Sequence, residues 1–230
     1  MSPVHATSFD SMQQAGWNST PIYMMDFEGG SSSGVVEFGV VRLLDGAIES
    51  TVTELCAPCG FIGAREQAVH GIVESEVAGR PPFTDFFETF VGFRKDGVFA
   101  AHNRHAENNF LKSTWAVPPA VPDWRRGEGH SHEWGPWVDT VPICKALYPG
   151  LESCSLGQLV EAFRIKDQLE ELARVHCPAN RRKAHCALYD ALASALLLIR
   201  LAEEEALAGH LSMGWLLQFS NGFSPQQELF

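Results

Sequence analysis

The sequence is short of positive charge. It has 17 lysine and arginine residues against 28 aspartate and glutamate residues, so its formal net charge is -11 over 230 residues. A surface of that sign repels phosphate groups, which argues against a broad electrostatic contact with duplex nucleic acid. A small site that handles a single strand end is still compatible with this charge.

Long apolar runs are also missing. The most apolar stretch, residues 188–205, is interrupted by Arg200 and ends in three glutamates, so we expect no membrane contact. Residues 1–20 lack the basic start and apolar centre of a secretory signal. The six cysteines have no regular spacing and are expected to be reduced thiols. Together these absences predict a soluble, cytoplasmic protein.

A second cysteine pair is missing too. Cys56 and Cys59 have the CxxC spacing of a zinc site, but a zinc ion needs further ligands. His130 and His132 could supply them if their loop folded back, although ordinary loop thiols account for the pattern more simply.

The apolar content that is present, 45% of the residues, is enough for one sizeable core. Three runs at 22–27, 34–43 and 48–55 are separated by glycine-rich and Asp-Gly segments, which predicts three consecutive antiparallel strands. Helical periodicity follows at 62–71 and 83–94. The remaining expectations are a strand at 97–103, a helix from about Glu107, a loop or insert at 117–136, a strand at 137–140, and helices at 141–149, 155–165 and 185–209.

This order of elements predicts an α/β domain with a mixed sheet. We expect the domain to cover residues 21–208, with a flexible N-terminal arm at 1–20 and a C-terminal extension at 209–230.

Acidic residues recur in three separated stretches. Asp26 and Glu28 end the first strand and, because side chains alternate, lie on one side of it. Glu107 follows a later strand, and His185 and Asp190 open the longest helix. Five helical residues turn through about 140°, so His185 can meet Asp190 only if it precedes the first helical turn.

Four convergent carboxylates are the usual ligands of paired Mg²⁺ or Mn²⁺ ions. Two such ions stabilise the attacking and leaving oxygens of a displacement at phosphorus. A histidine, with an ordinary pKa of about 6.5, suits a general base that activates water. These components predict metal-assisted phosphodiester hydrolysis.

The stretches MMDFEGG with VVEFGVV, AHNRHAENNFL and HCALYD, in this order, resemble the three motifs of the DEDDh group of 3′-to-5′ exonucleases. AVHGI at 68–72 and the segment 138–165 agree with the same family. The resemblance covers about residues 21–205 and implies an RNase H-like fold, a five-stranded mixed sheet with one antiparallel strand, flanked by helices.

The resemblance also implies residue roles. His185 would be the general base, and the metal ligands would be Asp26, Glu28, Glu107 and Asp190. The residues expected to hold the 3′-terminal nucleotide are Phe27, Glu28, Gly29, Gly30, Asn103 and His185. Two positions depart from the family pattern: Glu107 stands where aspartate is usual, and Gly29-Gly30 stand where threonines are frequent. Glu107 as a plain acid at a helix N-terminus is the alternative interpretation.

Other candidates have simpler interpretations. His70 is expected to be a structural or capping residue, and His102 and His105 are structural or contact substrate. Phe83, Phe86, Phe87 and Phe90 are expected in the core, with stacking on bases as the alternative.

The last five residues resemble short peptides that bind bacterial sliding clamps, through Gln226, Leu229 and Phe230. A tail packed on its own domain is the alternative, and a homodimer is left open.

We therefore expect a 3′-to-5′ exonuclease with two Mg²⁺ or Mn²⁺ ions that acts on single-stranded or frayed 3′ ends, with DNA favoured over RNA. The alternative is a catalytically weak or inactive scaffold of the same fold that binds a strand end or a replication partner. An endonuclease or RNase H-type activity is also compatible with the fold.

Overall fold

The computed structural model describes residues 16–123, 129–207 and 210–221. Most of the expected N-terminal arm and the clamp-like tail with Gln226, Leu229 and Phe230 lie outside these residues.

Three antiparallel strands begin the domain, as the sequence predicted. They are β1 (Ile22–Gly30), β2 (Gly34–Leu44) and β3 (Ala47–Leu55). Asp45 and Gly46 join β2 to β3 with φ angles of 52° and 75°. Positive φ at both central residues is the geometry of the tight turn that matches strand twist, and Asp-Gly supplies it at little cost.

Two parallel strands complete the main sheet. β4 (Val98–Ala101) pairs with β1, and β7 (Trp137–Asp139) pairs with β4, giving the order β3-β2-β1-β4-β7. Only β2 runs against the others, so within the described residues the sheet is five-stranded and mixed, with one antiparallel strand. This confirms the expected fold class.

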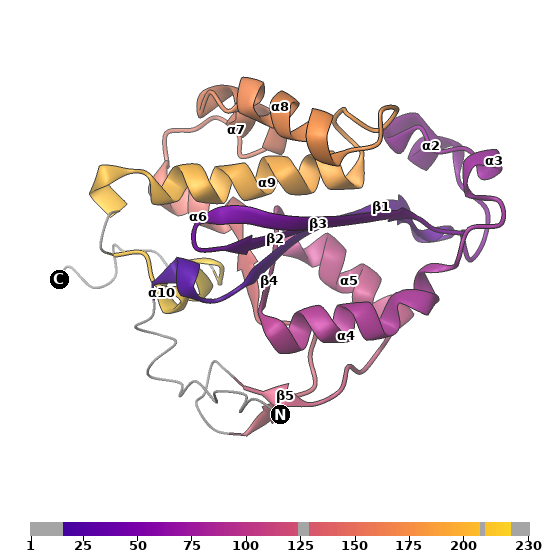
Figure 1. Ribbon diagram of the computed structural model, residues 1–230, viewed down its shortest axis with the longest axis horizontal. Coiled ribbons are helices and arrows are strands. Elements are labelled where there is room, and N and C mark those ends of the chain that lie inside the picture. The colour runs from indigo at the N-terminus through magenta and orange to yellow at the C-terminus, as the bar shows by residue number, and fades with distance from the viewer. Residues whose placement is uncertain (1–15, 124–128, 208–209, 222–230) are drawn as a thin grey trace.

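Helices cover both faces of the sheet (Figure 1). On one face α9 (Ala187–Ala202) packs on the even-numbered side chains of β1, such as Met24, and α7 (Leu156–Ala162) and α8 (Lys166–His176) pack on α9. On the other face α4 (Phe87–Asp96) and α5 (Arg104–Thr114) cover the odd-numbered ones. The alternation of β1 therefore decides which helix each of its side chains meets.

Shorter elements connect these layers. They are 3₁₀ turns at Trp17–Ser19, Phe83–Phe86 and Glu205–Leu207, helices α2 (Ala64–His70), α3 (Glu74–Val77) and α6 (Thr140–Leu147), a two-stranded pair of β5 (Val121–Pro122) with β6 (His130–Ser131), and helix α10 (Met213–Phe219).

Several elements differ from the expectations. Helix α5 begins at Arg104 rather than near Glu107. Asn103, whose φ is 78° in the left-handed region, is its N-cap and ends the preceding connection. The segment 117–136 carries the β5–β6 pair, and α8 has no counterpart among the predicted helices. None of the described helices is long and apolar enough to cross a membrane.

The described part of the C-terminal segment packs against the domain. Met213, Leu216 and Phe219 of α10 are buried in the same core cluster as α9. Gly16 forms an isolated bridge with Ser212, so the first described residue lies beside the start of α10.

Candidate active site

The end of β1 presents two carboxylates to one face of the sheet. Side chains alternate along a strand, so Asp26 and Glu28 lie on the same face of the sheet as Met24, the face covered by α9. Glu28 is paired with Glu37 of β2. Glu28 is buried with 8% of its surface exposed, and Asp26 is half-buried. The first of the three acidic stretches in the sequence therefore places the side chains of Asp26 and Glu28 on one face of the sheet.

The side chain of Phe27 points the other way. It lies among Phe83, Phe90 and Phe110, with ring centroids 5.4 to 6.3 Å away. The structure therefore does not bring the Phe27 ring to the carboxylates, and an expected role of Phe27 in substrate binding would rest on its backbone. Phe83 and Phe90 are buried in the core, as expected.

Helix α9 reaches the carboxylates because β2 has a glycine below it. Gly39 is paired with Asp26 in the sheet, and a Cβ atom at Gly39 would lie 2.2 Å from the Leu188 backbone nitrogen. Only a glycine lets the first turn of α9 lie this close to the sheet. That approach carries Asp190, in the first turn of α9, over the end of β1.

His185 lies before the helix, as its spacing from Asp190 required. Its φ is 61°, Cys186 is the N-cap of α9, and the His185 backbone N–H donates a 2.8 Å hydrogen bond to Asp190 Oδ2. The His185 side chain is exposed. Ligand atoms of Glu28, His185 and Asp190 all lie within 4.8 Å of one another.

Glu107 enters the site from α5. It is buried with 4% exposed, and its Oε2 atom has no hydrogen-bond partner among the described residues. An unpartnered buried carboxylate oxygen costs free energy unless something positive binds it.

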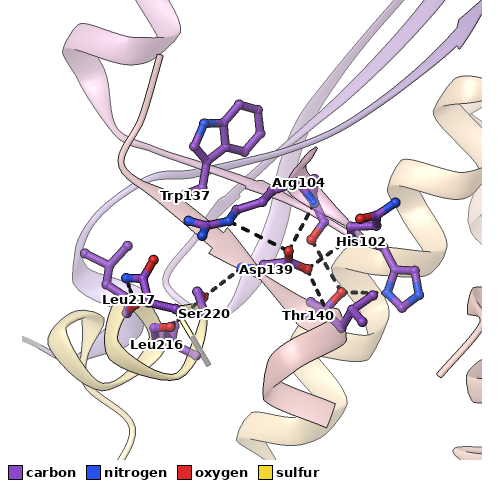
Figure 2. Close-up of polar contacts among 12 residues, drawn as sticks. His102, Arg104, Trp137, Asp139, Thr140, Leu216, Leu217 and Ser220 are labelled. Carbon is purple, nitrogen blue, oxygen red and sulfur yellow. Dashed lines mark hydrogen bonds and ion pairs between the residues drawn. The ribbon is translucent and has the colours of Figure 1, made fainter. Parts of the chain in front are cut away.

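A buried aspartate fixes the start of α5. Asp139, at the end of β7, accepts hydrogen bonds from the backbone N–H groups of Asn103 at 3.0 Å and Arg104 at 3.2 Å, and caps α6 at Val141. Figure 2 shows Asp139 between Arg104 and Ser220, whose hydroxyl accepts the Asp139 backbone N–H at 2.8 Å. The first turn of α5, and with it Glu107, is therefore tied to β7 and to the C-terminal end of α10.

Burial raises the pKa of all four carboxylates, and Asp26, Glu28 and Glu107 each have their pKa raised further by the charge of at least one of the others. Burial, then the charges of Asp190, Glu107 and Glu28, raise the pKa of Asp26 well above its ordinary value. Burial and neighbouring acids raise the pKa of Glu28 to about 8 and that of Glu107 to about 8. Burial raises the pKa of Asp190 to about 6, against the lowering effect of its bond to His185. These directions are those of acids crowded together without a counter-ion.

The buried arginine nearby is already engaged. Arg181 forms a two-pronged ion pair with Glu37, at 2.8 and 2.5 Å, and donates to the His70 carbonyl. Glu37 also accepts the Ala187 backbone N–H at 2.9 Å. This network attaches the segment that contains His185 to β2. It leaves the charges of Asp26 and Glu107 uncompensated, since every charge that shifts the pKa of either residue is negative.

The site therefore fits divalent metal ions. Mg²⁺ and Mn²⁺ bind carboxylate oxygens of the kind that Asp26, Glu28, Glu107 and Asp190 offer. The Oε2 atom of Glu107 has no hydrogen-bond partner among the described residues and is therefore available as a ligand atom.

Packing explains the two glycines at the end of β1. A Cβ at Gly29, whose φ is 147°, would lie 1.9 Å from the Gly34 carbonyl oxygen, and one at Gly30 would lie 2.3 Å from the Glu66 carboxylate. Asn103 has an exposed side chain at the start of α5. Gly29 and Gly30 directly follow Glu28, and Asn103 lies one helical turn before Glu107. The contact of these three residues with a nucleotide stays a prediction.

The other candidates have structural contacts. His70 is buried and its Nδ1 accepts the Ile72 backbone N–H at 3.0 Å, while His102 lies between Thr140 Oγ1 and the Cys154 carbonyl at 2.7 and 2.8 Å. Across the described residues, the group whose ligand atoms lie close enough to share a metal ion is Glu28, His185 and Asp190. Asp26 and Glu107, predicted as ligands, do not belong to this group, and neither do Cys56 and Cys59.

Comparison with known proteins agrees with this geometry. A family profile described as RNase T, exonuclease, matches residues 30–198. The chain belongs to this exonuclease family. The match begins two residues after Glu28 and includes Glu107, His185 and Asp190, and it confirms the resemblance to 3′-to-5′ exonucleases.

Two curated relatives illustrate the range of this family. Exodeoxyribonuclease 10 of Escherichia coli K12 is 26% identical over 170 residues, which is 74% of this chain and 63% of that protein. The PolC-type DNA polymerase III of Thermotoga petrophila is 25% identical over 169 residues, 74% of this chain but 10% of the polymerase. The chain thus spans about a tenth of the polymerase and under two thirds of the exodeoxyribonuclease.

Solved structures share the fold. A structure of exonuclease X in complex with 5′ overhanging duplex DNA has a TM-score of 0.58 and 23% identity, covering 86% of this chain and 99% of that one. A 3′-exonuclease that recognises a histone mRNA stem-loop has a TM-score of 0.59 and 14% identity, over 83% of this chain and 66% of that one. The RNase H-like fold expected from the sequence is therefore confirmed.

Sequence reasoning missed the supporting residues. Glu37, Gly39, Asp139 and Arg181 hold the site but carry none of its proposed chemistry. The EFG pattern of β2 and the aspartate ending β7 were visible as part of the resemblance. Their functions were not, because each depends on a contact between segments far apart in the chain.

Proposed function

We propose that this protein is a metal-dependent 3′-to-5′ exonuclease that removes nucleoside monophosphates from single-stranded or frayed 3′ ends, with DNA the favoured polymer. The observation that carries the proposal is the cluster at the end of β1. Ligand atoms of Glu28, His185 and Asp190 lie within 4.8 Å of one another, and the charges of Asp190, Glu107 and Glu28 raise the pKa of Asp26. Family membership supports nuclease chemistry for such a site.

The four carboxylates would hold the metal ions. Two bound Mg²⁺ or Mn²⁺ ions would supply electrostatic stabilisation of the oxygens that enter and leave the phosphorus. The orphaned oxygen of Glu107 and the adjacent oxygens of Glu28 and Asp190 are the ligand atoms that the geometry favours.

His185 would act as the general base. Its exposed imidazole lies before α9, and its backbone N–H is held by Asp190. The imidazole would take a proton from the attacking water as the new oxygen–phosphorus bond forms. The bond from phosphorus to the 3′ oxygen of the preceding nucleotide would break, releasing a nucleoside 5′-monophosphate.

The 3′-terminal nucleotide would lie at the end of β1. Glu28, the backbone from Phe27 to Gly30, Asn103 and His185 border this position and would contact its sugar and base. The structure of exonuclease X with DNA supports DNA as the polymer to test first.

The test is shortening of 5′-labelled single-stranded DNA and RNA of equal sequence, with Mg²⁺, Mn²⁺ or EDTA. We expect a metal-dependent ladder that recedes from the 3′ end, and His185→Ala is expected to slow it by about 10²–10⁴-fold. His176→Ala is the matched control, since that half-buried imidazole contacts Thr51 on β3.

No shortening of either polymer with either metal would overturn the proposal. Tight binding of a strand without turnover would then favour the scaffold interpretation, which rests on Glu107 in the position where the family usually has aspartate.

A further inference from the structure

A separate pocket lies beside α5, next to the carboxylate site. Its volume is about 260 Å³, and its lining includes Arg104, His105, Asn108, Lys112, Trp137 and Asn221. The lining comes from α5, from the segment that leads into β7, and from the end of α10. Asp26, Glu28, Glu107, His185 and Asp190 are not part of it.

Helical geometry puts the Arg104 end of the pocket beside Glu107. At about 100° per residue, Arg104, Asn108 and Lys112 form one stripe of α5. Around the helix axis, Glu107 projects about 60° from Arg104, about 100° from Asn108 and about 140° from Lys112. Along the axis, at 1.5 Å per residue, Arg104 is about 4.5 Å and Lys112 about 7.5 Å from Glu107. A strand whose end lies at Glu107 could therefore have a neighbouring nucleotide in the pocket.

The lining gathers cationic and donor groups in a protein of net charge -11. In the described parts of the chain, Lys112 and His105 have no ion pair, and both side chains are exposed. Arg104 contacts Asp139 through Nε at 4.0 Å, and Figure 2 shows the rest of its guanidinium extending past Asp139 below Trp137. Among the described residues that line the pocket, Glu133 is the single acid, and it takes part in an interaction of its own.

Asn108 adds a second, independent observation. Its Oδ1 atom is buried and has no hydrogen-bond partner among the described residues. Since the two ends of an amide are exchangeable by rotation, Asn108 can offer a donor or an acceptor to an occupant. A buried amide end without a partner costs free energy, and rotation of the side chain toward the pocket would let a polar ligand satisfy it.

We propose that this pocket binds a backbone phosphate of the substrate strand, on the 5′ side of the nucleotide being removed. Lys112 and Arg104 supply the charge, and Asn108 and His105 supply hydrogen bonds. This inference rests on the proposed function, because the strand enters the pocket only if its 3′ end lies at the carboxylates. It also explains how a protein with so few cations retains a polyanion beside four acids.

The experiment measures strand binding separately from turnover. Fluorescence anisotropy of 5′-fluorescein-labelled decathymidylate gives the dissociation constant at several salt concentrations with Mg²⁺, in a His185→Ala background that keeps the strand intact. Lys112→Gln is compared with Lys95→Gln. Both lysines are exposed in the last turn of a helix, but Lys95 belongs to α4 and is not part of the pocket lining.

Lys112→Gln is expected to weaken binding by about two- to fivefold. It should also make the plot of the logarithm of the association constant against the logarithm of the salt concentration less steep by about 0.7, the change for one phosphate contact on a single strand. Lys95→Gln is expected to keep the parent slope. Equal slopes for both variants, or no binding of decathymidylate, would overturn the inference.

Turnover of the p-nitrophenyl ester of thymidine 5′-monophosphate by the unsubstituted chain tests the proposed function alone, because the ester has no upstream nucleotide. Ester turnover with equal slopes rejects the pocket and keeps the exonuclease. A reduced slope without ester turnover rejects the exonuclease and, with it, the position of the pocket relative to a nucleotide being removed, and leaves only a phosphate contact of a strand-binding scaffold.

Discussion

At the scale of single residues, the site is an accumulation of like charge. Glu28 and Glu107 are buried, and each has a pKa raised to about 8 by burial and by neighbouring acids. Such an arrangement is unfavourable in the chain by itself, and it becomes favourable when a cation binds. The residues at the centre of the site are therefore selected for binding rather than for the stability of the metal-free fold.

This predicts an unusual dependence of stability on pH in EDTA. Folding raises the pKa of Glu28 and Glu107 from 4.5 to about 8 and that of Asp190 from 3.8 to about 6, so the folded chain keeps protons that the unfolded chain has released. Their contribution to the free energy of unfolding is complete below the unfolded pKa values and is lost as the pH rises toward 8. Differential scanning fluorimetry should show a larger gain in Tm on adding Mg²⁺ at pH 8.5 than at pH 5.5.

The control is Glu171→Gln, at an exposed position of α8, which should respond to pH and Mg²⁺ like the unsubstituted chain. A gain in Tm that is equal at both pH values would contradict the assignment of these carboxylates as the metal ligands.

At the scale of elements, the site depends on how closely α9 approaches the sheet. The first turn of α9 rests on Gly39, and Glu37 accepts the Ala187 N–H from the same turn. Asp139 holds the first turn of α5 in the same manner from β7. Two helix starts, each fixed by one strand residue, thus set the positions of Asp190 and Glu107.

Gly39→Ala should separate α9 from β2. The added Cβ would meet backbone atoms of Ala187 and Leu188, so the helix must shift, at a cost of about 1–3 kcal/mol in stability. A displacement of about 1 Å at the carboxylates can lower turnover by on the order of 10²-fold. Thermal unfolding and turnover of a labelled oligonucleotide measure the two effects.

Gly92→Ala is the matched control. Gly92 lies in α4, and a Cβ added there would have no heavy atom within 4 Å, so alanine should stabilise the helix by about 1 kcal/mol and leave turnover unchanged. If Gly39→Ala behaved like Gly92→Ala, the close approach of α9 would have no role in the site.

The elements show how far sequence reasoning reaches. The three antiparallel strands were predictable because alternation and Asp45-Gly46 are local signals. The position of His185 before α9 followed from its spacing to Asp190. Helix α8 was missed although its sequence is amphipathic, and the early start of α5 depends on Asn103 being held by Asp139 across 36 residues. Contacts of that range leave no local pattern.

At the scale of the whole molecule, the C-terminal segment takes part in the domain. Leu216 is fully buried in the core cluster of α9, and Ser220 connects α10 to Asp139. The boundary expected at residue 208 therefore falls before a helix that supports the start of α5, and we propose that the folded unit extends at least to Ser220.

Leu216→Ala should test this extent. Removing a fully buried leucine side chain is expected to lower the free energy of unfolding by about 2–5 kcal/mol. Gln218→Ala, at an exposed position of the same helix, should change it by less than about 0.5 kcal/mol. Chemical denaturation with urea measures both, and similar small changes for the two variants would mean that α10 is not part of the cooperative fold.

The central claim is that Asp26, Glu28, Glu107 and Asp190 lie together because they hold metal ions. Isothermal titration calorimetry with Mn²⁺ tests it most directly, comparing the unsubstituted chain with Glu107→Gln and with Glu171→Gln. The account predicts binding of two ions by the unsubstituted chain and by Glu171→Gln, and weaker or incomplete binding by Glu107→Gln, since its orphaned oxygen is removed. No Mn²⁺ binding by the unsubstituted chain, or a Glu107→Gln titration that matches it, would contradict the account.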